Sequence, residues 1–155
     1  MSAAADHAQV RINPPVLTLV HILAAFLLQW LLPLPLPAPA FIRVLGVLLV
    51  LGSLALAFSA VRQFSRVPTT LHPHAPVTAV VTGGPYRFSR NPIYVCYVCL
   101  LVGFPLALNS YWGAVLSPLL VLLLTRLVIQ YEEAYLERQF GQVYLDYKSR
   151  VRRWL

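Results

Sequence analysis

The hydrophobic pattern of this chain consists of long stretches without a charged residue. About 20 apolar residues in a helix cross a bilayer core about 30 Å thick. The first two stretches are long enough to predict membrane-spanning helices near residues 15–32 and 43–62. Small residues in the second, such as Gly46 and Gly52, would let neighbouring helices pack closely. The long apolar stretches without a charged residue cover residues 13–42, 44–61 and 91–125.

The third uncharged stretch, residues 91–125, is too long for one straight membrane helix. As a helix it would extend about 52 Å at about 1.5 Å per residue, well beyond the hydrocarbon core. The polar pair Asn109-Ser110 lies in its middle. The stretch therefore predicts a helical hairpin with spans near residues 92–108 and 111–131.

The pattern changes after Tyr131, where charged and aromatic residues are mixed over residues 132–155. Such a mixture is typical of an interfacial helix, with aromatic rings at the headgroup level and basic residues toward anionic lipid. Gly141 is expected to end or bend its first part. The sequence therefore predicts an all-α fold, a polytopic membrane helix bundle. It would have about four transmembrane helices plus a C-terminal interfacial helix, in a single membrane domain over residues 1–155.

The composition favours a membrane protein. Hydrophobic residues make up 59% of the 155 residues and charged residues only 11%, whereas soluble domains carry about 25% charged residues. Cys96 and Cys99 have a spacing that zinc and redox sites also use, but no further ligands lie near them in sequence. Packing of two small residues in a membrane helix is the favoured interpretation. His72 and His74 have no carboxylate nearby in sequence, so no metal site is predicted.

The net charge of +7 has a topological interpretation. The basic residues border apolar segments and form no stripe with interleaved aromatic residues, so nucleic acid is not an expected partner. Most of them lie in the 62–91 loop or follow the fourth span, and the positive-inside rule then places this loop and both termini in the cytoplasm. Ala38-Pro39-Ala40 resembles a signal-peptide cleavage site, but a single Arg precedes the first apolar run, and we expect no cleavage.

The conspicuous polar groups gather on one side of the predicted membrane domain, in the loop 69–91 and at Glu132-Glu133. Adjacent carboxylates project about 100° apart on a helix, so a single salt bridge rarely serves both. One interpretation is a solvated interfacial pair that answers Arg62 or Arg90. The other is a functional pair where the membrane ends.

Two further features have both a structural and a functional interpretation. Arg126 lies seven residues before Glu133, two turns along the same helical face, and close to the apolar run, where ionisable groups are functional candidates. Gly-Gly-Pro at 83–85 predicts a tight turn. Asn91-Pro92 predicts a helix start whose free N–H groups would suit an anion. No G-x-G-x-x-G and no alternation of strands and helices is present, which excludes a soluble nucleotide-binding fold.

Five short motifs follow one another over residues 69–153, about half of the chain. They are Val80-Val81-Thr82, Gly84-Pro85-Tyr86, Arg90-Asn91-Pro92-Ile93-Tyr94, Glu132-Glu133 and Phe140-Gly141-Gln142-Val143-Tyr144-Leu145-Asp146-Tyr147. In this order and spacing they resemble the membrane-embedded methyltransferases typified by isoprenylcysteine carboxyl methyltransferase, to which phospholipid N-methyltransferases are related. Each motif alone is unspecific, and only the combination carries the resemblance.

The resemblance implies a site for S-adenosylmethionine at the matching positions. The cofactor-binding residues would be Thr78, Ala79, Val80, Val81, Tyr86, Arg90, Asn91, Pro92, Ile93, Tyr94, Glu132 and Glu133. Arg126 would orient the substrate, and Arg126 and Glu133 are the predicted catalytic residues. Many members, including the eukaryotic enzymes, carry His at the position of Asn91. Asn cannot titrate near neutral pH, so a proton-handling role is not expected there, although Asn can still hydrogen-bond the cofactor.

The implied function is S-adenosylmethionine-dependent methyl transfer at the cytoplasmic face of the membrane. The acceptor would be a lipophilic molecule that arrives from the bilayer among the membrane lipids, with a carboxylate, as in isoprenylcysteine methyl-ester formation, as one option. Two other interpretations stay open. One is an NADPH-dependent membrane reductase of the sterol reductase type, whose C-terminal half is similar. The other is a small non-enzymatic membrane protein in which Glu132 and Glu133 serve only topology.

Overall fold

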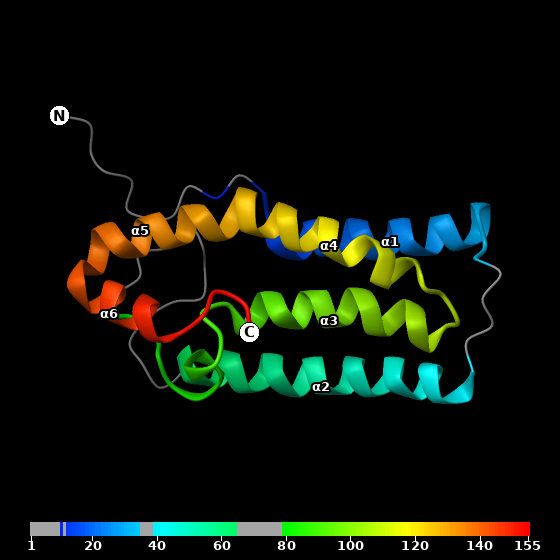
Figure 1. The fold of residues 1–155 in the computed structure, drawn as a ribbon, viewed down its shortest axis with the longest axis horizontal. Helices are drawn as coiled ribbons and strands as arrows, with labels where there is room; N and C mark the ends of the chain where they lie inside the picture. Colours follow the sequence, from blue (N-terminus) through cyan, green and yellow to red (C-terminus); the bar gives the residue numbers. More distant parts are fainter. Residues whose placement is uncertain (1–9, 11, 35–38, 65–78) are drawn as a thin grey trace.

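The computed structural model of the chain describes residues 10, 12–34, 39–64 and 79–155, and within these ranges it consists of helices without a strand. Four long helical stretches lie side by side (Figure 1). They are α1 (Pro14–Leu31), α2 (Ala40–Phe64), α3 (Pro92–Ala107) and a continuous stretch of α4 (Trp112–Leu124), the π-helix η2 (Thr125–Ile129) and α5 (Gln130–Phe140). Two short helices are the 3-10 helix η1 (Gly84–Arg87) and α6 (Gln142–Arg150). The predicted all-α membrane helix bundle is confirmed.

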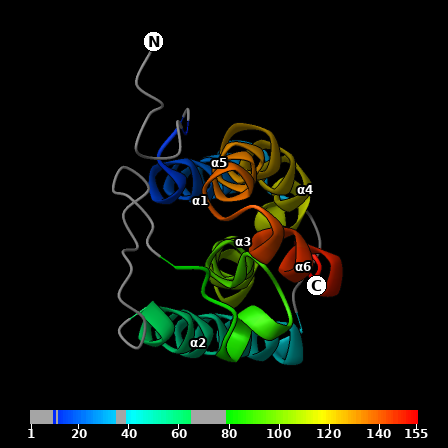
Figure 2. The ribbon, with the colours of Figure 1, turned by 90° about the vertical axis from the view of Figure 1, so that its left-hand side faces the viewer.

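Helix α3 lies at the centre of the bundle. Seen along the helices, it lies between α2 and a layer that contains α1, α4 and α5 (Figure 2). It packs along α2 and also contacts α1 and α4. The turn after α3 has Asn109 in the left-handed region, with a φ of 65°. The predicted hairpin with its break at Asn109-Ser110 is therefore present.

In the described part of the chain, three helices are long and apolar enough to cross a membrane, and α3 is apolar but has only 16 residues. The three are Pro14–Leu31, Ala40–Gln63 and Trp112–Phe140. The last has 29 residues and would extend about 43 Å. About 20 of these residues suffice for the hydrocarbon core, so its spanning part ends near Tyr131 and the residues from Glu132 onward project beyond the core.

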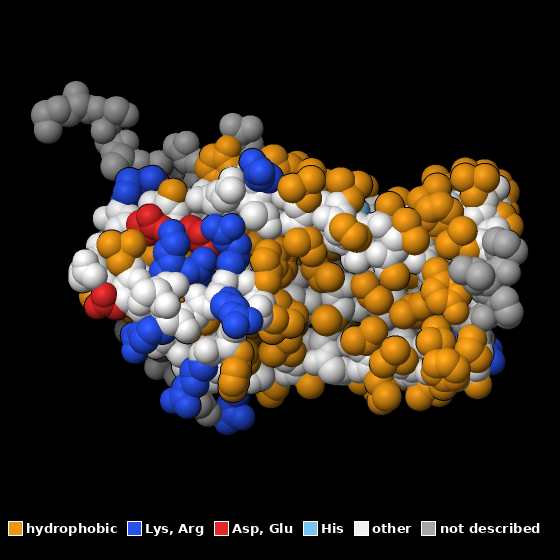
Figure 3. Space-filling model, in the orientation of Figure 1, with side chains coloured by type: hydrophobic (Ala, Val, Ile, Leu, Met, Phe, Trp, Pro, Cys, Tyr) orange, Lys and Arg blue, Asp and Glu red, His pale blue; other side chains and the backbone are white. Residues whose placement is uncertain are grey.

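The surface is divided into an apolar body and a charged end. Hydrophobic side chains cover most of the length of the bundle, whereas Lys, Arg, Asp and Glu gather at the end where α5 and α6 lie (Figure 3). On the apolar body, Leu23, Leu48 and Val115 are 59%, 58% and 55% exposed. Large exposed apolar surfaces of this kind require a covering other than water. Together with the spans, this surface identifies an integral membrane protein.

Three glycines permit close contacts between helices in the apolar body. A Cβ atom on Gly46 of α2 would lie 2.7 Å from the carbonyl oxygen of Gly103 on α3, and one on Gly103 would lie 2.8 Å from that of Gly46. A Cβ on Gly113 of α4 would collide with the carbonyl oxygen of Leu101. Gly52, by contrast, faces open space. Of the two glycines expected to assist packing, only Gly46 does so.

The segment after the last span consists of two helices instead of one. Gly141 separates α5 from α6 with a φ of 51°, as expected for a glycine that ends a helix. Helix α6 and residues 151–155 then turn back toward the start of α3 (Figure 1). We call residues 142–155 the return segment. Its Tyr144 and Tyr147 are buried within the protein, so these two rings contact protein and not the lipid headgroups that the interfacial pattern predicted.

Candidate functional site

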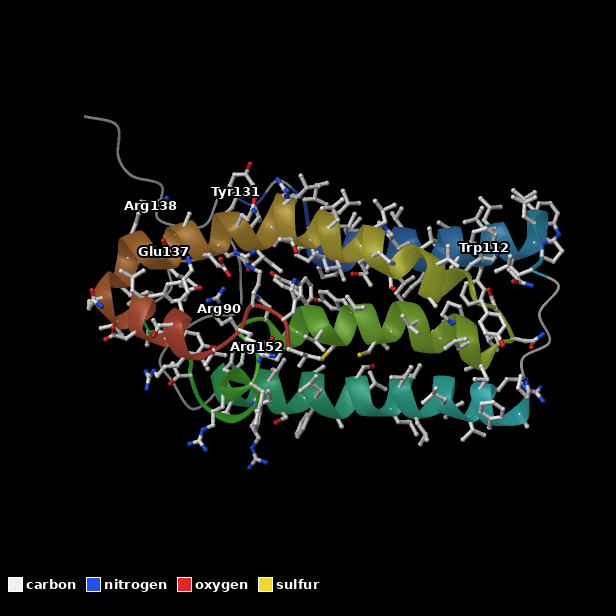
Figure 4. All side chains as sticks on the ribbon, viewed as in Figure 1. Arg90, Trp112, Tyr131, Glu137, Arg138 and Arg152 are labelled. Carbon is white, nitrogen blue, oxygen red and sulfur yellow. The ribbon has the colours of Figure 1, made fainter. Side chains whose placement is uncertain are left out.

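The charged end brings together η1, the start of α3, α5 and the return segment. Glu137 of α5 and Arg90 from the loop before α3 lie on the side of α5 that faces α6, whereas Arg138 points away from the bundle (Figure 4). The residues that bridge these elements are separated by 11 to 64 positions in the sequence. The site is therefore assembled by the fold and not by one local motif.

Glu133 is the most tightly held side chain of this end. It is 5% exposed. Its Oε1 accepts hydrogen bonds from Arg90 Nη2 at 2.8 Å and from Arg153 Nε at 2.9 Å, and its Oε2 accepts one from Arg153 Nη2 at 2.7 Å. Burial opposes ionisation of this carboxyl, but the hydrogen bonds of Arg153 and the charges of Arg90, Arg153 and Lys148 outweigh burial and hold the pKa of Glu133 below its ordinary value.

Glu132 has different surroundings from its neighbour. Its Oε1 accepts a hydrogen bond from Tyr94 Oη at 2.7 Å, which links α5 to the first turns of α3. Part of its surface stays accessible. Burial raises the pKa of Glu132 above its ordinary value; the hydrogen bond from Tyr94 opposes this shift and the charge of Glu133 adds to it. The two carboxylates thus serve two faces of α5, one toward the arginines and one toward α3.

The return segment holds the loop that leads into α3. Asn91 Nδ2 donates to the carbonyl oxygen of Arg153 at 3.0 Å, and Ser89 Oγ donates to the same oxygen at 3.3 Å. The backbone N–H of Arg90 donates to the carbonyl oxygen of Arg152 at 2.9 Å. Asn91 occupies the N-cap position of α3 without a side-chain cap, and its Nδ2 connects the start of α3 to Arg153.

Two more contacts connect α6 to η1 and to Arg90. Tyr147 Oη donates to the carbonyl oxygen of Tyr86 at 2.8 Å, and Arg90 Nη1 donates to that of Lys148 at 3.0 Å. Burial raises the pKa of Tyr147 to about 12, against the lowering effect of Arg90. Tyr147 therefore stays protonated as a donor at any ordinary pH.

The structure brings most of the predicted cofactor residues to this end. Val81 and Tyr86 form one buried cluster with Ala60 of α2, and Ile93 of α3 packs against it. Pro92 is fully buried, in the first turn of α3, and Ala79 and Val80 are partly exposed. Thr78, also predicted to bind the cofactor, lies outside the described residues, as do Arg66, His72 and His74.

The prediction that Arg126 and Glu133 share one face of a helix is wrong. The five residues of η2, which include Arg126, are π-helical. A π-helix has more residues per turn than an α-helix, since its bonds run from i to i+5. Seven positions therefore no longer correspond to two turns, and Arg126 is exposed while Glu133 is buried. The role of Arg126 toward a substrate stays a prediction.

Sequence reasoning missed Arg153 and the buried tyrosines of the return segment. The cluster of basic residues near the end of the sequence was assigned to lipid contact, and Arg153 shares no helical spacing with Glu133. Of the two structural partners considered for the glutamate pair, Arg90 is the one that the structure places at Glu133.

The fold and this polar end define a multi-pass, all-helical membrane protein with a candidate ligand site beyond one end of its spans. The chain belongs to the phospholipid methyltransferase family, whose match covers residues 41–143. It is therefore a membrane methyltransferase. An uncharacterized protein of Haemophilus influenzae is 35% identical over 63 residues, which are 41% of this chain and 100% of that protein. No solved structure matches the chain.

Proposed function

We propose that the protein transfers a methyl group from S-adenosylmethionine to a lipophilic acceptor at the cytoplasmic face of the membrane. The observation that carries this proposal is the pair of Tyr94 and Glu132, which joins α3 and α5 beside the predicted cofactor loop. Both residues lie within the part of the chain that matches the methyltransferase family.

The donors and acceptors at this end fit the groups of S-adenosylmethionine. The cofactor carries an ammonium, a carboxylate and ribose hydroxyls, and it supplies an activated methyl group when bound. The carboxylate of Glu132 suits the ammonium or the hydroxyls. Arg90 suits the carboxylate, because its Nε is buried and has no hydrogen-bond partner among the described residues.

The two glutamates would contribute in different ways. Both oxygens of Glu133 accept hydrogen bonds from arginines, so this residue holds the elements of the charged end in position. Glu132 would hold and orient the ligand, because alignment and exclusion of water are the main requirements of a displacement reaction. A carboxylate acceptor is ionised at neutral pH and needs no base. For an amine acceptor, the raised pKa of Glu132 makes it the better proton acceptor of the two.

The distribution of charge supports the cytoplasmic side for the site. Among the described residues, Arg43 is the one basic residue at the opposite end of the bundle. Arg62, Arg87, Arg138 and Arg150 lie at the site end with the arginines of the network. The positive-inside rule then orients the site end toward the cytoplasm, where the cofactor is available, and the acceptor enters from the bilayer.

The test is calorimetric titration of the full chain in detergent with S-adenosylmethionine and S-adenosylhomocysteine. We expect saturable binding that Glu132→Gln weakens about tenfold to a hundredfold, since a hydrogen bond to a charged group contributes about 1.5–3 kcal/mol. Tyr94→Phe should weaken it less, because the carboxylate remains. Glu137→Gln, a change of the same kind further along α5, is the matched control and should bind normally.

Two results would contradict the proposal. One is the absence of binding in folded wild-type protein. The other is unchanged affinity in both Glu132→Gln and Tyr94→Phe. Competition by NADPH for the same site would instead favour the reductase interpretation.

A further inference from the structure

We propose that the return segment positions residues 79–91, the described part of the predicted cofactor loop 69–91, and that Arg153 is the positioning residue that ties these residues to α5. The inference rests on the proposed function, because it concerns the same site. Arg153 lies beyond residues 41–143, the part of the chain that matches the family.

Arg153 connects three parts of the site with one residue. Its guanidinium binds both oxygens of Glu133 on α5, at 2.9 and 2.7 Å. Its backbone carbonyl accepts from Asn91 and Ser89 in front of α3. A displacement of Arg153 would thus remove its two hydrogen bonds to Glu133, which Arg90 also binds, and its two hydrogen bonds to the residues before α3 at the same time.

The residues around Arg153 fix it in place. Trp154 packs against the main apolar core. On the other side, Tyr147 holds Tyr86. The return segment is therefore anchored before and after the ion pair, so Arg153 presents its fork to Glu133 in one defined orientation.

The geometry requires an arginine at this position. A planar guanidinium binds the two carboxylate oxygens with parallel N–H groups, whereas the ammonium of lysine is a point charge without this fork. Arg153 acts through Glu133, Asn91 and Ser89. A lysine in its place should keep part of the attraction and lose the fixed orientation.

The first experiment needs no ligand. Amide hydrogen exchange by mass spectrometry on the full chain in detergent compares wild type with Arg153→Gln. We expect exchange at least tenfold faster in both residues 84–91 and residues 142–155, with α2 unchanged as evidence of an intact bundle. Arg152→Gln is the matched control: it removes the same charge one residue away, from an exposed side chain, and keeps its backbone carbonyl. It should stay within twofold of wild type.

The second experiment is a double-mutant cycle on S-adenosylhomocysteine affinity. Arg153→Gln and Glu133→Gln should each weaken binding about tenfold, and Arg153→Lys should lie between Arg153→Gln and wild type. The double variant should bind at most about twofold more weakly than the single variant with the lower affinity, because the link that Arg153→Gln breaks is already lost in Glu133→Gln.

Three results would overturn the inference. The first is unchanged exchange in residues 84–91 of Arg153→Gln, and the second is normal affinity of that variant despite faster exchange. The third is a double variant whose loss is the product of the two single losses, because Glu133 would then act on the cofactor independently of Arg153. Absence of ligand binding in the wild type would contradict the proposed function instead, and the exchange result would still decide whether the return segment orders the loop.

Discussion

The apolar body and the charged end of this protein are held together by different means. In the body, the backbones of neighbouring helices approach closely where a glycine has no side chain, as at Gly46 with Gly103 and at Gly113 with Leu101. At the charged end, side chains hold backbone groups of distant segments, and Arg153 with Glu133 forms the centre of that network. One region depends on the absence of side-chain atoms and the other on particular donor and acceptor atoms.

This difference separates stability from function. Packing of an apolar helix against its neighbours and lipid is satisfied by many apolar residues, provided that the close contacts stay free. A network of buried polar groups has few solutions, because each donor requires its acceptor. Changes in the body should therefore remove fold and binding together, whereas changes at the charged end should remove binding first. The following changes test that separation.

The largest effect is expected from Gly113→Val. Its side chain would collide with the carbonyl oxygen of Leu101 on α3, and backbone cannot yield as a flexible side chain does. Overpacking typically costs about 1–3 kcal/mol, and a collision with backbone should reach the upper end or exceed it. The measurement is the thermal unfolding midpoint in detergent, followed by circular dichroism, together with the yield of monodisperse protein.

Gly52→Ala is the matched control for this change. A Cβ there meets nothing within 4 Å, and Ala favours a helix interior by about 1 kcal/mol over Gly. We expect an unchanged or slightly raised midpoint. A midpoint for Gly113→Val as high as that of Gly52→Ala would show that the helices of the body are not in the close contact described.

The body was predictable from sequence because its signal is local. Uncharged stretches, proline breaks and the pair Asn109-Ser110 each report on their own segment, and the helices lie where these signals placed them. No local sequence signal of this kind indicated that residues 125–129 form a π-helix instead of an α-helix. The π-helix changes the direction in which Arg126 projects, but it leaves the number and order of apolar residues in the segment unchanged.

The charged end was predictable only in part. The pair Glu132-Glu133 and the Asn91–Tyr94 segment stand out because charge is so rare in this chain. Which glutamate meets which partner depends on the return of the chain after Gly141, and Arg153 reaches Glu133 across 20 positions and Asn91 across 62. No periodicity encodes such a contact.

A smaller effect is expected from acidification, and it concerns Glu133. Its pKa is lowered in the folded protein, so the ionised form stabilises the fold above the ordinary carboxyl pKa of about 4.5. That stabilisation is lost as the pH falls below this value through the lowered one. At pH 7, Glu133→Gln should lower the unfolding midpoint, by an amount that corresponds to about 1–3 kcal/mol. The difference from wild type should shrink as the pH falls toward 3.5.

The control for this pH dependence is Glu137→Gln, which removes a less buried carboxylate of the same helix. Its difference from wild type should be small at every pH. A difference for Glu133→Gln that stays constant between pH 7 and 3.5 would mean that ionisation of Glu133 does not stabilise the charged end.

The smallest effect is expected from Lys148→Gln. The ammonium of Lys148 pairs with Glu137, but the two side chains are 36% and 34% exposed, and such pairs contribute less than about 1 kcal/mol because water and salt screen them. The backbone carbonyl of Lys148, which accepts from Arg90, is retained in the variant. Unfolding midpoint and S-adenosylhomocysteine affinity should both stay near wild type, with the small remaining difference vanishing at high salt. A loss of affinity as large as that of Arg153→Gln would contradict the conclusion that the buried pair of Arg153 and Glu133 holds the charged end together. The exposed charge of Lys148 would then hold the end of α6.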